Sequence, residues 1–219
     1  MLTINPSPLS ADTIERALGE FGVKASAEQI ASIQRYIGML LAWNAKINLT
    51  AIREPIEILY RHFCESMFAA TLVPLDSSRL ADVGSGGGFP GLPLKIVCPA
   101  LQLFLVESNV KKATFLAEAV RELELKEARV LVSRYEELGE EVAPLDSVCS
   151  RALGDFGKFL TWAGSPQVGA KQVILWLGAE DASKVRNMGG WDWQEPIAIP
   201  QSLRRYILIG AKVDGATGW

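Results

Sequence analysis

The fold class is indicated most clearly by one stretch, Leu80-Ala81-Asp82-Val83-Gly84-Ser85-Gly86-Gly87-Gly88-Phe89-Pro90-Gly91. It begins as a short apolar strand and then breaks into a run of glycines. Pro90 suits the first turn of a helix, where the amide hydrogen that proline lacks would have no partner. A strand, a glycine-rich turn and a helix in this order open a doubly wound α/β fold, whose ligands lie beyond the carboxyl end of the strand.

The glycines of this stretch fit two ligand-binding patterns. Counted from Gly86, the spacing Gly-x-Gly-x-x-Gly matches a dinucleotide fingerprint, which favours a protein that binds NAD. Counted from Asp82, the spacing Asp-x-Gly-x-Gly-x-Gly resembles the first motif of S-adenosylmethionine-dependent methyltransferases. Their cofactor carries a sulfonium and an ammonium group, which a nearby carboxylate stabilises. Asp82, Gly84, Gly86 and Gly88 are therefore candidates for cofactor binding.

Composition and the rare residue types restrict the class of protein. Hydrophobic residues make up 49% of the 219 residues and charged residues 21%, as in globular proteins with a full core. One histidine and three widely spaced cysteines lack the spacing of a zinc site, so we expect no metal and reduced, buried thiols. No apolar run approaches the ~20 residues of a membrane span, which favours a cytoplasmic protein with no membrane partner. The net charge of −3 neither indicates nor excludes a nucleic-acid partner, because a local basic face would suffice.

The first part of the chain predicts helices. Ser10 and Ser26 can each cap a helix, and both helices carry an apolar stripe. Residues 43–52 mix asparagine, lysine and threonine with large apolar side chains and predict a structured loop. A third helix is expected after Pro55. We therefore expect an N-terminal helical extension over residues 1–75.

From Arg79 onward, strand-like segments alternate with helical periodicity, which is typical of a mostly parallel sheet. Beyond the first strand, the sequence predicts strands at 101–107, 128–132, 145–149 and 172–177, a helix at 110–125, and a closing pair of strands at 196–199 and 206–212. The predicted fold is a doubly wound α/β core over residues 76–219.

Charged residues follow three of the predicted strands. Glu107 ends the second strand, 23 residues beyond Gly84, where an acid can accept the ribose hydroxyls of a bound nucleoside. Arg134 and Arg151 follow the third and fourth strands, and a guanidinium there can pair with a carboxylate, a phosphate or a base edge. Because the carboxyl ends of parallel strands share one edge of the sheet, we expect these residues beside the glycine turn.

Five segments together are similar to one protein family. They are Trp43-Asn44-x-Lys46-x-Asn48-Leu49-Thr50-Ala51, Arg61-His62, the stretch 82–91, Ser133-Arg134 with Glu136, and Ser150-Arg151-Ala152. Their combination resembles the bacterial small-subunit ribosomal RNA guanine-N7 methyltransferase family, also called glucose-inhibited division protein B, over roughly residues 26 to 178. The glycine motif alone indicates only a methyltransferase, and the other segments make the resemblance specific.

This resemblance implies a Rossmann-like class I methyltransferase core with an N-terminal helical extension. It implies methyl transfer from S-adenosylmethionine to N7 of one guanine in 16S ribosomal RNA, within the small ribosomal subunit or an assembly intermediate, and we expect a monomer. By similarity, Gly84, Phe89, Tyr135, Glu136 and Arg151 lie around the cofactor.

The implied chemistry agrees with the residues that the sequence lacks. Guanine N7 has a free lone pair and no proton to remove, so the reaction needs no general base and we assign no acid or base. Alignment of the lone pair, the methyl group and the sulfonium should supply much of the acceleration, and Arg151 is the candidate that positions the reactants. Lys46, Arg53, Arg61 and Arg134 are candidate contacts to the RNA substrate.

The sequence departs from the family pattern at two positions. Glu65 stands where an aspartate is usual, and Leu177 stands where the family carries a lysine, which removes a cation from the active edge. Three alternatives stay open: a methyltransferase acting on a different RNA or on a small molecule, an NAD-dependent oxidoreductase, and a non-catalytic ribosome-assembly factor. Binding of NADH would select the oxidoreductase, and failure to bind any cofactor would select the assembly factor.

Overall fold

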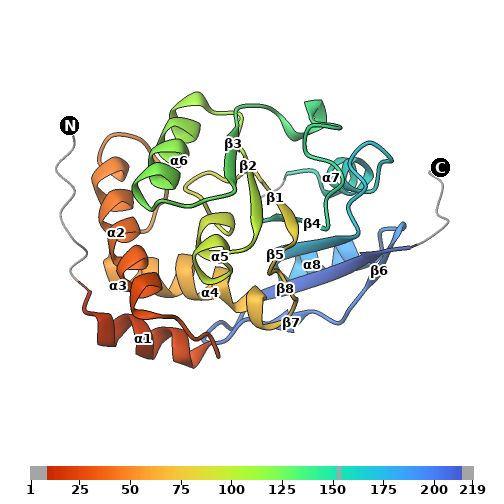
Figure 1. The fold of residues 1–219 in the computed structure, drawn as a ribbon. Coiled ribbons are helices and arrows are strands. Elements are labelled where there is room, and N and C mark those ends of the chain that lie inside the picture. The colour runs from red at the N-terminus through yellow and green to blue at the C-terminus, as the bar shows by residue number, and fades with distance from the viewer. Residues whose placement is uncertain (1–8, 152–153, 214–219) are drawn as a thin grey trace.

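The computed structural model describes residues 9–151 and 154–213, whose strands form one eight-stranded sheet (Figure 1). The strands are β1 (Arg79–Val83), β2 (Gln102–Val106), β3 (Ala128–Leu131), β4 (Ser147–Ser150), β5 (Gln172–Gly178), β6 (Trp191–Trp193), β7 (Ile197–Ala198) and β8 (Arg205–Lys212). Their order is β3-β2-β1-β4-β5-β8-β6, and β7 pairs with β8. β1 to β5 run parallel, and β8 lies antiparallel to β5. The predicted doubly wound, mostly parallel sheet is confirmed.

Helices precede the sheet and connect its strands. They are α1 (Ala11–Glu20), α2 (Ala27–Asn44), α3 (Pro55–Ile58), the π-helical η1 (Leu59–Cys64), α4 (Glu65–Met67), η2 (Phe68–Thr71), α5 (Gly91–Val97), α6 (Val110–Glu122), η3 (Tyr135–Glu137), α7 (Phe156–Ala163) and α8 (Ala179–Arg186). The predicted cap of α2 is confirmed, because Ser26 Oγ accepts from the amide of Gln29 at 3.2 Å and Gln29 Oε1 accepts from the amide of Ser26 at 2.8 Å.

Alternate residues of each strand face two separate apolar cores. In β1, Leu80 packs into the core that the helices from α1 to α6 cover, whereas Ala81 and Val83 pack into the core that α7 and α8 cover. This alternation follows from the two-residue period of a strand, and burial of both faces is typical of parallel sheets. In Figure 1, α4 and α5 lie in front of the sheet and α8 lies behind it. The carboxyl ends of the parallel strands therefore form the edge where a ligand can bind.

The helical extension packs directly against the sheet domain. The division near residue 75 stays a prediction about the chain, but residues from both sides of it share one apolar core. Ile14 of α1, Phe63 of η1, Leu92 of α5 and Ile209 of β8 all belong to that core. The extension therefore lies against the strand–helix unit that carries the glycines.

Two predictions for the extension need correction. The loop expected over 43–52 begins later, because α2 continues through Asn44 and the Trp43 ring packs on Phe115 at a centroid distance of 5.7 Å. Asn44 then shapes the loop, since its Oδ1 accepts from the amides of Leu49 and Thr50 at 2.8 and 3.1 Å. The expected third helix is present, but it changes from α3 to the π-helical η1 and back to α4.

Smaller corrections concern the sheet domain. The helix expected over 110–125 ends at Glu122, and Glu124 then adopts a left-handed φ of 52°. Strand β4 begins at Ser147 instead of residue 145, and β6 was not predicted. The three cysteines are free and buried, as expected. Within the described residues, no helix is long and apolar enough to cross a membrane.

Candidate functional site

The turn after β1 has the left-handed backbone that its glycines allow. Gly84 has a φ of 71° and Gly86 a φ of 55°, angles that a residue with a side chain adopts only with strain. The amides of Gly84 and Ser85 donate to the carbonyl oxygen of Val106 at 2.9 and 3.1 Å. These bonds fix the turn to the carboxyl end of β2.

Glu107 holds the turn from the neighbouring strand. Its Oε2 accepts from the amide of Gly86 and its Oε1 accepts from the amide of Asn109, each at 2.8 Å. The side chain is buried, yet each carboxylate oxygen has further acceptor capacity for a ligand hydroxyl. Glu107 therefore shapes the turn and also offers an acceptor at the edge of the sheet.

A cavity of about 350 Å³ lies at the carboxyl ends of β1, β2 and β3. It brings together five of the predicted site residues: Gly84, Glu107, Arg134, Tyr135 and Glu136. The Tyr135 ring packs edge-on against Phe159 and Trp162 at 5.9 and 5.2 Å, which holds this wall of the cavity in place. The volume lies within the range of small-molecule sites.

The other predicted cofactor residues do not line this cavity: they are Asp82, Gly86, Gly88, Phe89 and Arg151. Asp82 is fully buried beneath the turn, where its Oδ2 accepts from the amide of Gly91 at 3.0 Å and burial raises its pKa to about 7. The Phe89 ring lies in the apolar core, stacked against His62 at 4.5 Å and Tyr36 at 5.5 Å. Both side chains pack against the underside of the turn, and their part in cofactor binding stays a prediction.

His62 is held in a neutral state by its surroundings. Its Nε2 lies 2.7 Å from Thr50 Oγ1, and its ring stacks on Phe89. Burial, assisted by the nearby positive charges of Arg151 and Arg61, lowers its pKa to about 3. The imidazole therefore carries no charge near neutral pH and packs as part of the wall behind the turn.

Arg151, at the end of β4, belongs to a cluster around Glu65. The Glu65 carboxylate is only 2% exposed and lies 3.1 Å from Arg151 Nη2 and 3.5 Å from Arg61 Nε. It also accepts from Arg205 Nε at 2.9 Å. One buried carboxylate thus holds three guanidinium groups, which leaves two excess positive charges at this edge. Ala152, the last residue of the Arg151 motif, lies outside the described residues.

Sequence reasoning missed Arg205. The residue starts β8, 140 positions beyond Glu65, and only the antiparallel pairing of β8 with β5 brings it opposite Gly178. Leu177 is buried in the core on the α8 side of the sheet, so its side chain points away from the cluster. No local sequence signal could have identified the contact, because it depends on the order of the strands.

The other substrate candidates are exposed and lie in separate places. Lys46 and Arg53 lie between α2 and α3, and Arg61 lies in η1 beside Glu65. Arg134 lines the cavity, whereas Lys46 and Arg53 do not. The structure therefore brings Arg61 to Arg151 and Arg134 to Glu107, and it places Lys46 and Arg53 on the extension.

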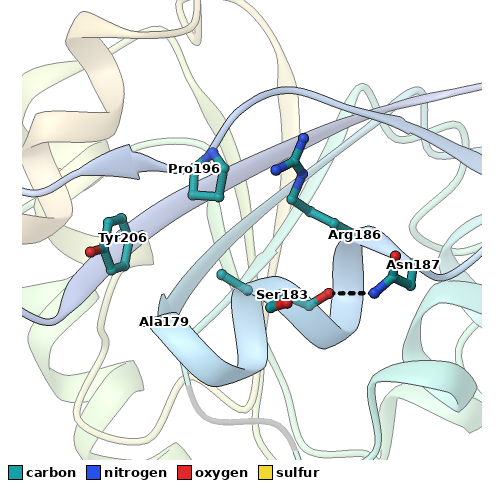
Figure 2. A pocket seen from close by; sticks show the side chains of 7 residues that line it. Ala179, Ser183, Arg186, Asn187, Pro196 and Tyr206 are labelled. Atoms are coloured by element: carbon teal, nitrogen blue, oxygen red, sulfur yellow. Dashed lines mark hydrogen bonds between the residues drawn. The ribbon is translucent and has the colours of Figure 1, made fainter.

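A larger cavity of about 510 Å³ lies between α8 and the segment that includes β7 and β8 (Figure 2). Arg186 of α8 and Tyr206 of β8 line it, but the Arg186 guanidinium is paired with both oxygens of Glu195. None of the predicted site residues lines this cavity. In the part of the chain that the structure describes, no group of three or more histidine, cysteine or acidic side chains could hold a metal ion. Five of the predicted site residues therefore line the smaller cavity beside the glycine turn, and none lines the larger one.

Solved structures share this fold. A SAM-dependent methyltransferase from Aquifex aeolicus matches with a TM-score of 0.58 at 14% identity, over 73% of this chain and 94% of that one. A mutant of MtNAS in complex with S-adenosylmethionine matches with a TM-score of 0.57 at 13% identity, over 92% of this chain and 77% of that one. At these identities the likeness establishes the fold alone.

Sequence comparison establishes the family. Residues 29–187 match the model described as GidB, rRNA small subunit methyltransferase G. The ribosomal RNA small subunit methyltransferase G of Dichelobacter nodosus (strain VCS1703A) is 40% identical over 154 residues, which are 70% of this chain and 72% of that protein. The protein of the same name from Stenotrophomonas maltophilia (strain K279a) is 38% identical over 200 residues, 90% of this chain and 92% of that protein. The chain belongs to the rRNA small subunit methyltransferase G family.

Proposed function

We propose that this chain transfers the methyl group of S-adenosylmethionine to N7 of one guanine in 16S ribosomal RNA. The observation that carries the proposal is the cavity at the glycine turn, where Gly84, Glu107 and Glu136 meet in a chain of an rRNA methyltransferase family. Family membership favours methyl transfer over the oxidoreductase and the assembly-factor alternatives.

The residues around the cavity suit a nucleoside cofactor. Gly84 has no side chain to fill the space beside the turn, and Glu107 offers acceptors for ribose hydroxyls. Glu136 can accept from the amino group of adenine, and the Tyr135 ring supplies an apolar wall. S-adenosylmethionine, when bound, supplies an electrophilic methyl group on its sulfonium.

The chain needs to position the target base and has no proton to remove from it. Guanine N7 attacks through a free lone pair, so a neutral His62 and the absence of an assigned base agree with the reaction. Arg151 is the positioning candidate, because its guanidinium lies at the end of β4 and is held there by Glu65. A preorganised guanidinium can hold a base edge or a carboxylate without reorganisation during the reaction.

Exposed cations on the extension suit the phosphate backbone of RNA. Lys46, Arg53 and Arg61 are all exposed, and Arg61 adds its charge to the cluster around Glu65. Contacts outside the cavity would let the enzyme recognise a folded RNA, within the small ribosomal subunit or an assembly intermediate. We propose that the enzyme acts there as a cytoplasmic monomer.

A labelling experiment tests this proposal. The purified protein is incubated with S-adenosylmethionine carrying a labelled methyl group and with unmethylated 16S RNA, small ribosomal subunits or free guanosine. We expect label in 7-methylguanosine from the RNA or the subunits, and little label in free guanosine, because remote contacts hold the base in line. Label in another nucleoside, or equally efficient labelling of free guanosine, would contradict the proposal.

A further inference from the structure

Tyr36 of the helical extension lies directly beneath the glycine turn. Its side chain is fully buried, and its hydroxyl donates a hydrogen bond to the carbonyl oxygen of Gly87 at 2.5 Å. Burial raises the pKa of Tyr36 well above its usual value, so the phenol keeps the proton that it donates. A residue of α2 thus contacts the turn across 51 positions of sequence.

The Tyr36 ring is fixed by aromatic neighbours on several sides. It stacks on Phe89 at 5.5 Å with 13° between the ring planes, and it meets Phe63 edge-on at 5.1 Å. Phe115 of α6 stacks on it at 6.2 Å. A hydroxyl carried by such a ring has little freedom to follow the carbonyl if the turn moves.

The hydrogen bond secures one particular peptide unit. The carbonyl of Gly87 accepts from Tyr36, while the amide of Gly88, in the same peptide unit, donates to the carbonyl oxygen of Ser85 at 2.7 Å. Both polar ends of this peptide are therefore bonded, and its plane cannot turn without breaking one of the bonds. Gly86, Gly87 and Gly88 would otherwise be the most flexible part of the turn.

Close packing at Gly88 also indicates that Tyr36 restrains the turn. Gly88 has a φ of 87°, and a Cβ atom there would lie 2.1 Å from the Tyr36 hydroxyl oxygen. By contrast, a Cβ at Gly84 would meet nothing within 4 Å, and a Cβ at Gly86 would meet only the carbonyl oxygen of Gly84, at 3.8 Å. Gly88 is therefore the glycine that the approach of Tyr36 requires, whereas Gly84 is the one that lines the cavity.

We propose that Tyr36 is a positioning residue for the cofactor loop: its hydroxyl holds the Gly87–Gly88 peptide in the orientation that cofactor binding needs. The inference rests on the proposed function, because it takes the glycine turn as the S-adenosylmethionine site. It makes the helical extension part of the cofactor site and extends its role beyond contact with RNA.

The variant Tyr36→Phe removes the hydroxyl and keeps the stacked ring. It leaves the buried carbonyl of Gly87 without its donor, so the turn gains other conformations and the cofactor must select among them. We expect the dissociation constant for S-adenosylmethionine to rise ~10-fold, in line with the loss of one buried hydrogen bond. The rate at saturating cofactor and RNA should stay within ~2-fold of the wild type, because the bound state restores the loop.

Tyr60→Phe is the matched control. Tyr60 lies in the same extension, and its hydroxyl donates to Glu20 Oε1 at 2.9 Å near the surface, away from the turn. Calorimetric titration of S-adenosylmethionine into the wild type, Tyr36→Phe and Tyr60→Phe, with thermal melts of all three, separates a local effect from a general loss of stability. Weakened binding in Tyr36→Phe alone supports the inference. Equal affinity in all three proteins, or equal weakening in both variants, overturns it.

Two measurements on the wild-type protein complete the test. If it binds no S-adenosylmethionine, the proposed function and this inference both fail, whereas wild-type binding with an unaffected Tyr36→Phe overturns the inference alone. If Tyr36→Phe does not fold, amide hydrogen exchange of the wild type decides. Protection of the Gly88 amide at the level of core amides supports the fixed peptide, and exchange as fast as that of the exposed Ser108 overturns it.

Discussion

Two adjacent glutamates in η3 differ in their surroundings, so one can contact a ligand in the cavity and the other is a surface charge. Glu136 lines the cavity, whereas Glu137 accepts from Ser133 Oγ at 3.0 Å and is not among the lining residues. Glu136→Ala should therefore weaken S-adenosylmethionine binding by ~1 kcal/mol, or ~5-fold, through the loss of one charged acceptor at an exposed site. Glu137→Ala should leave the affinity unchanged. Titration calorimetry checks both, and equal affinities for the two variants would remove Glu136 from the site.

His62 makes a contribution to stability that decreases as the pH falls. The pKa of His62 falls from 6.5 to about 3 on folding, so below pH 6.5 the unfolded chain binds a proton that the folded chain does not bind. The free energy of unfolding therefore decreases as the pH falls from about 6.5 toward 3. Between pH 7.5 and pH 5, the wild type should lose ~2 kcal/mol relative to His62→Gln. Asp82, whose raised pKa acts in the opposite sense, is present in both proteins and cancels from the difference.

Urea denaturation of the wild type and His62→Gln at the two pH values measures this difference. The glutamine can still bond to Thr50, so the comparison mainly reports the charge. The same pH dependence in both proteins would show that folding does not lower the pKa of His62.

At the scale of elements, the contact between β8 and α4 depends on Glu65. Arg205→Ala removes one of the guanidinium groups around this buried carboxylate while Arg151 and Arg61 remain, so we expect a loss of ~1–3 kcal/mol of unfolding free energy. Arg204 is the adjacent, exposed arginine, and Arg204→Ala should change stability by less than ~0.5 kcal/mol. Denaturant unfolding of both variants tests the contrast, and equal stabilities would mean that Glu65 does not need its β8 partner.

Local elements of this structure could be predicted from the sequence, whereas contacts between distant elements could not. The strand, turn and helix from Leu80 to Gly91 follow from local pattern, since apolar alternation, glycine conformation and proline placement all act over a few residues. In the Glu65 cluster, Arg61 is a local i,i+4 partner, whereas Arg151 and Arg205 reach Glu65 only through the strand order and the antiparallel pairing of β8. Spacing specifies the turn, but it does not specify which face of the turn the side chains of Asp82 and Phe89 occupy; in the structure both lie beneath it.

At the scale of the whole molecule, we predict that RNA binding depends on the part of the helical extension that carries Lys46 and Arg53. Lys46 and Arg53 lie on the extension, whereas Lys126 precedes β3 at the amino end of the parallel strands. Lys46→Gln and Arg53→Gln should each weaken RNA binding and reduce the slope of log affinity against log salt concentration by ~1, the result of losing one phosphate contact. Lys126→Gln should change neither quantity. Filter-binding or fluorescence titrations across a salt series check this, and equal slopes for all three variants would place the RNA elsewhere.

The fold class was predictable as a whole because strands and helices alternate from residue 79 onward, and parallel sheets of this kind have few alternative connections. The way the extension joins the sheet was not predictable, since Tyr36 looks in sequence like any apolar position on the stripe of α2. Its contact with Gly87 appears only when α2 packs against α5 and α6.

Methyl transfer to 16S ribosomal RNA is tested by mass spectrometry of its nucleosides, from cells with and without this protein. We expect 7-methylguanosine at one position to be present with the wild-type protein, lost without it, and restored by the wild-type gene. We also expect Glu136→Ala to restore less of the modification than Glu137→Ala when the cofactor is limiting. An unchanged 7-methylguanosine content in cells that lack the protein would contradict methylation of 16S ribosomal RNA by this chain.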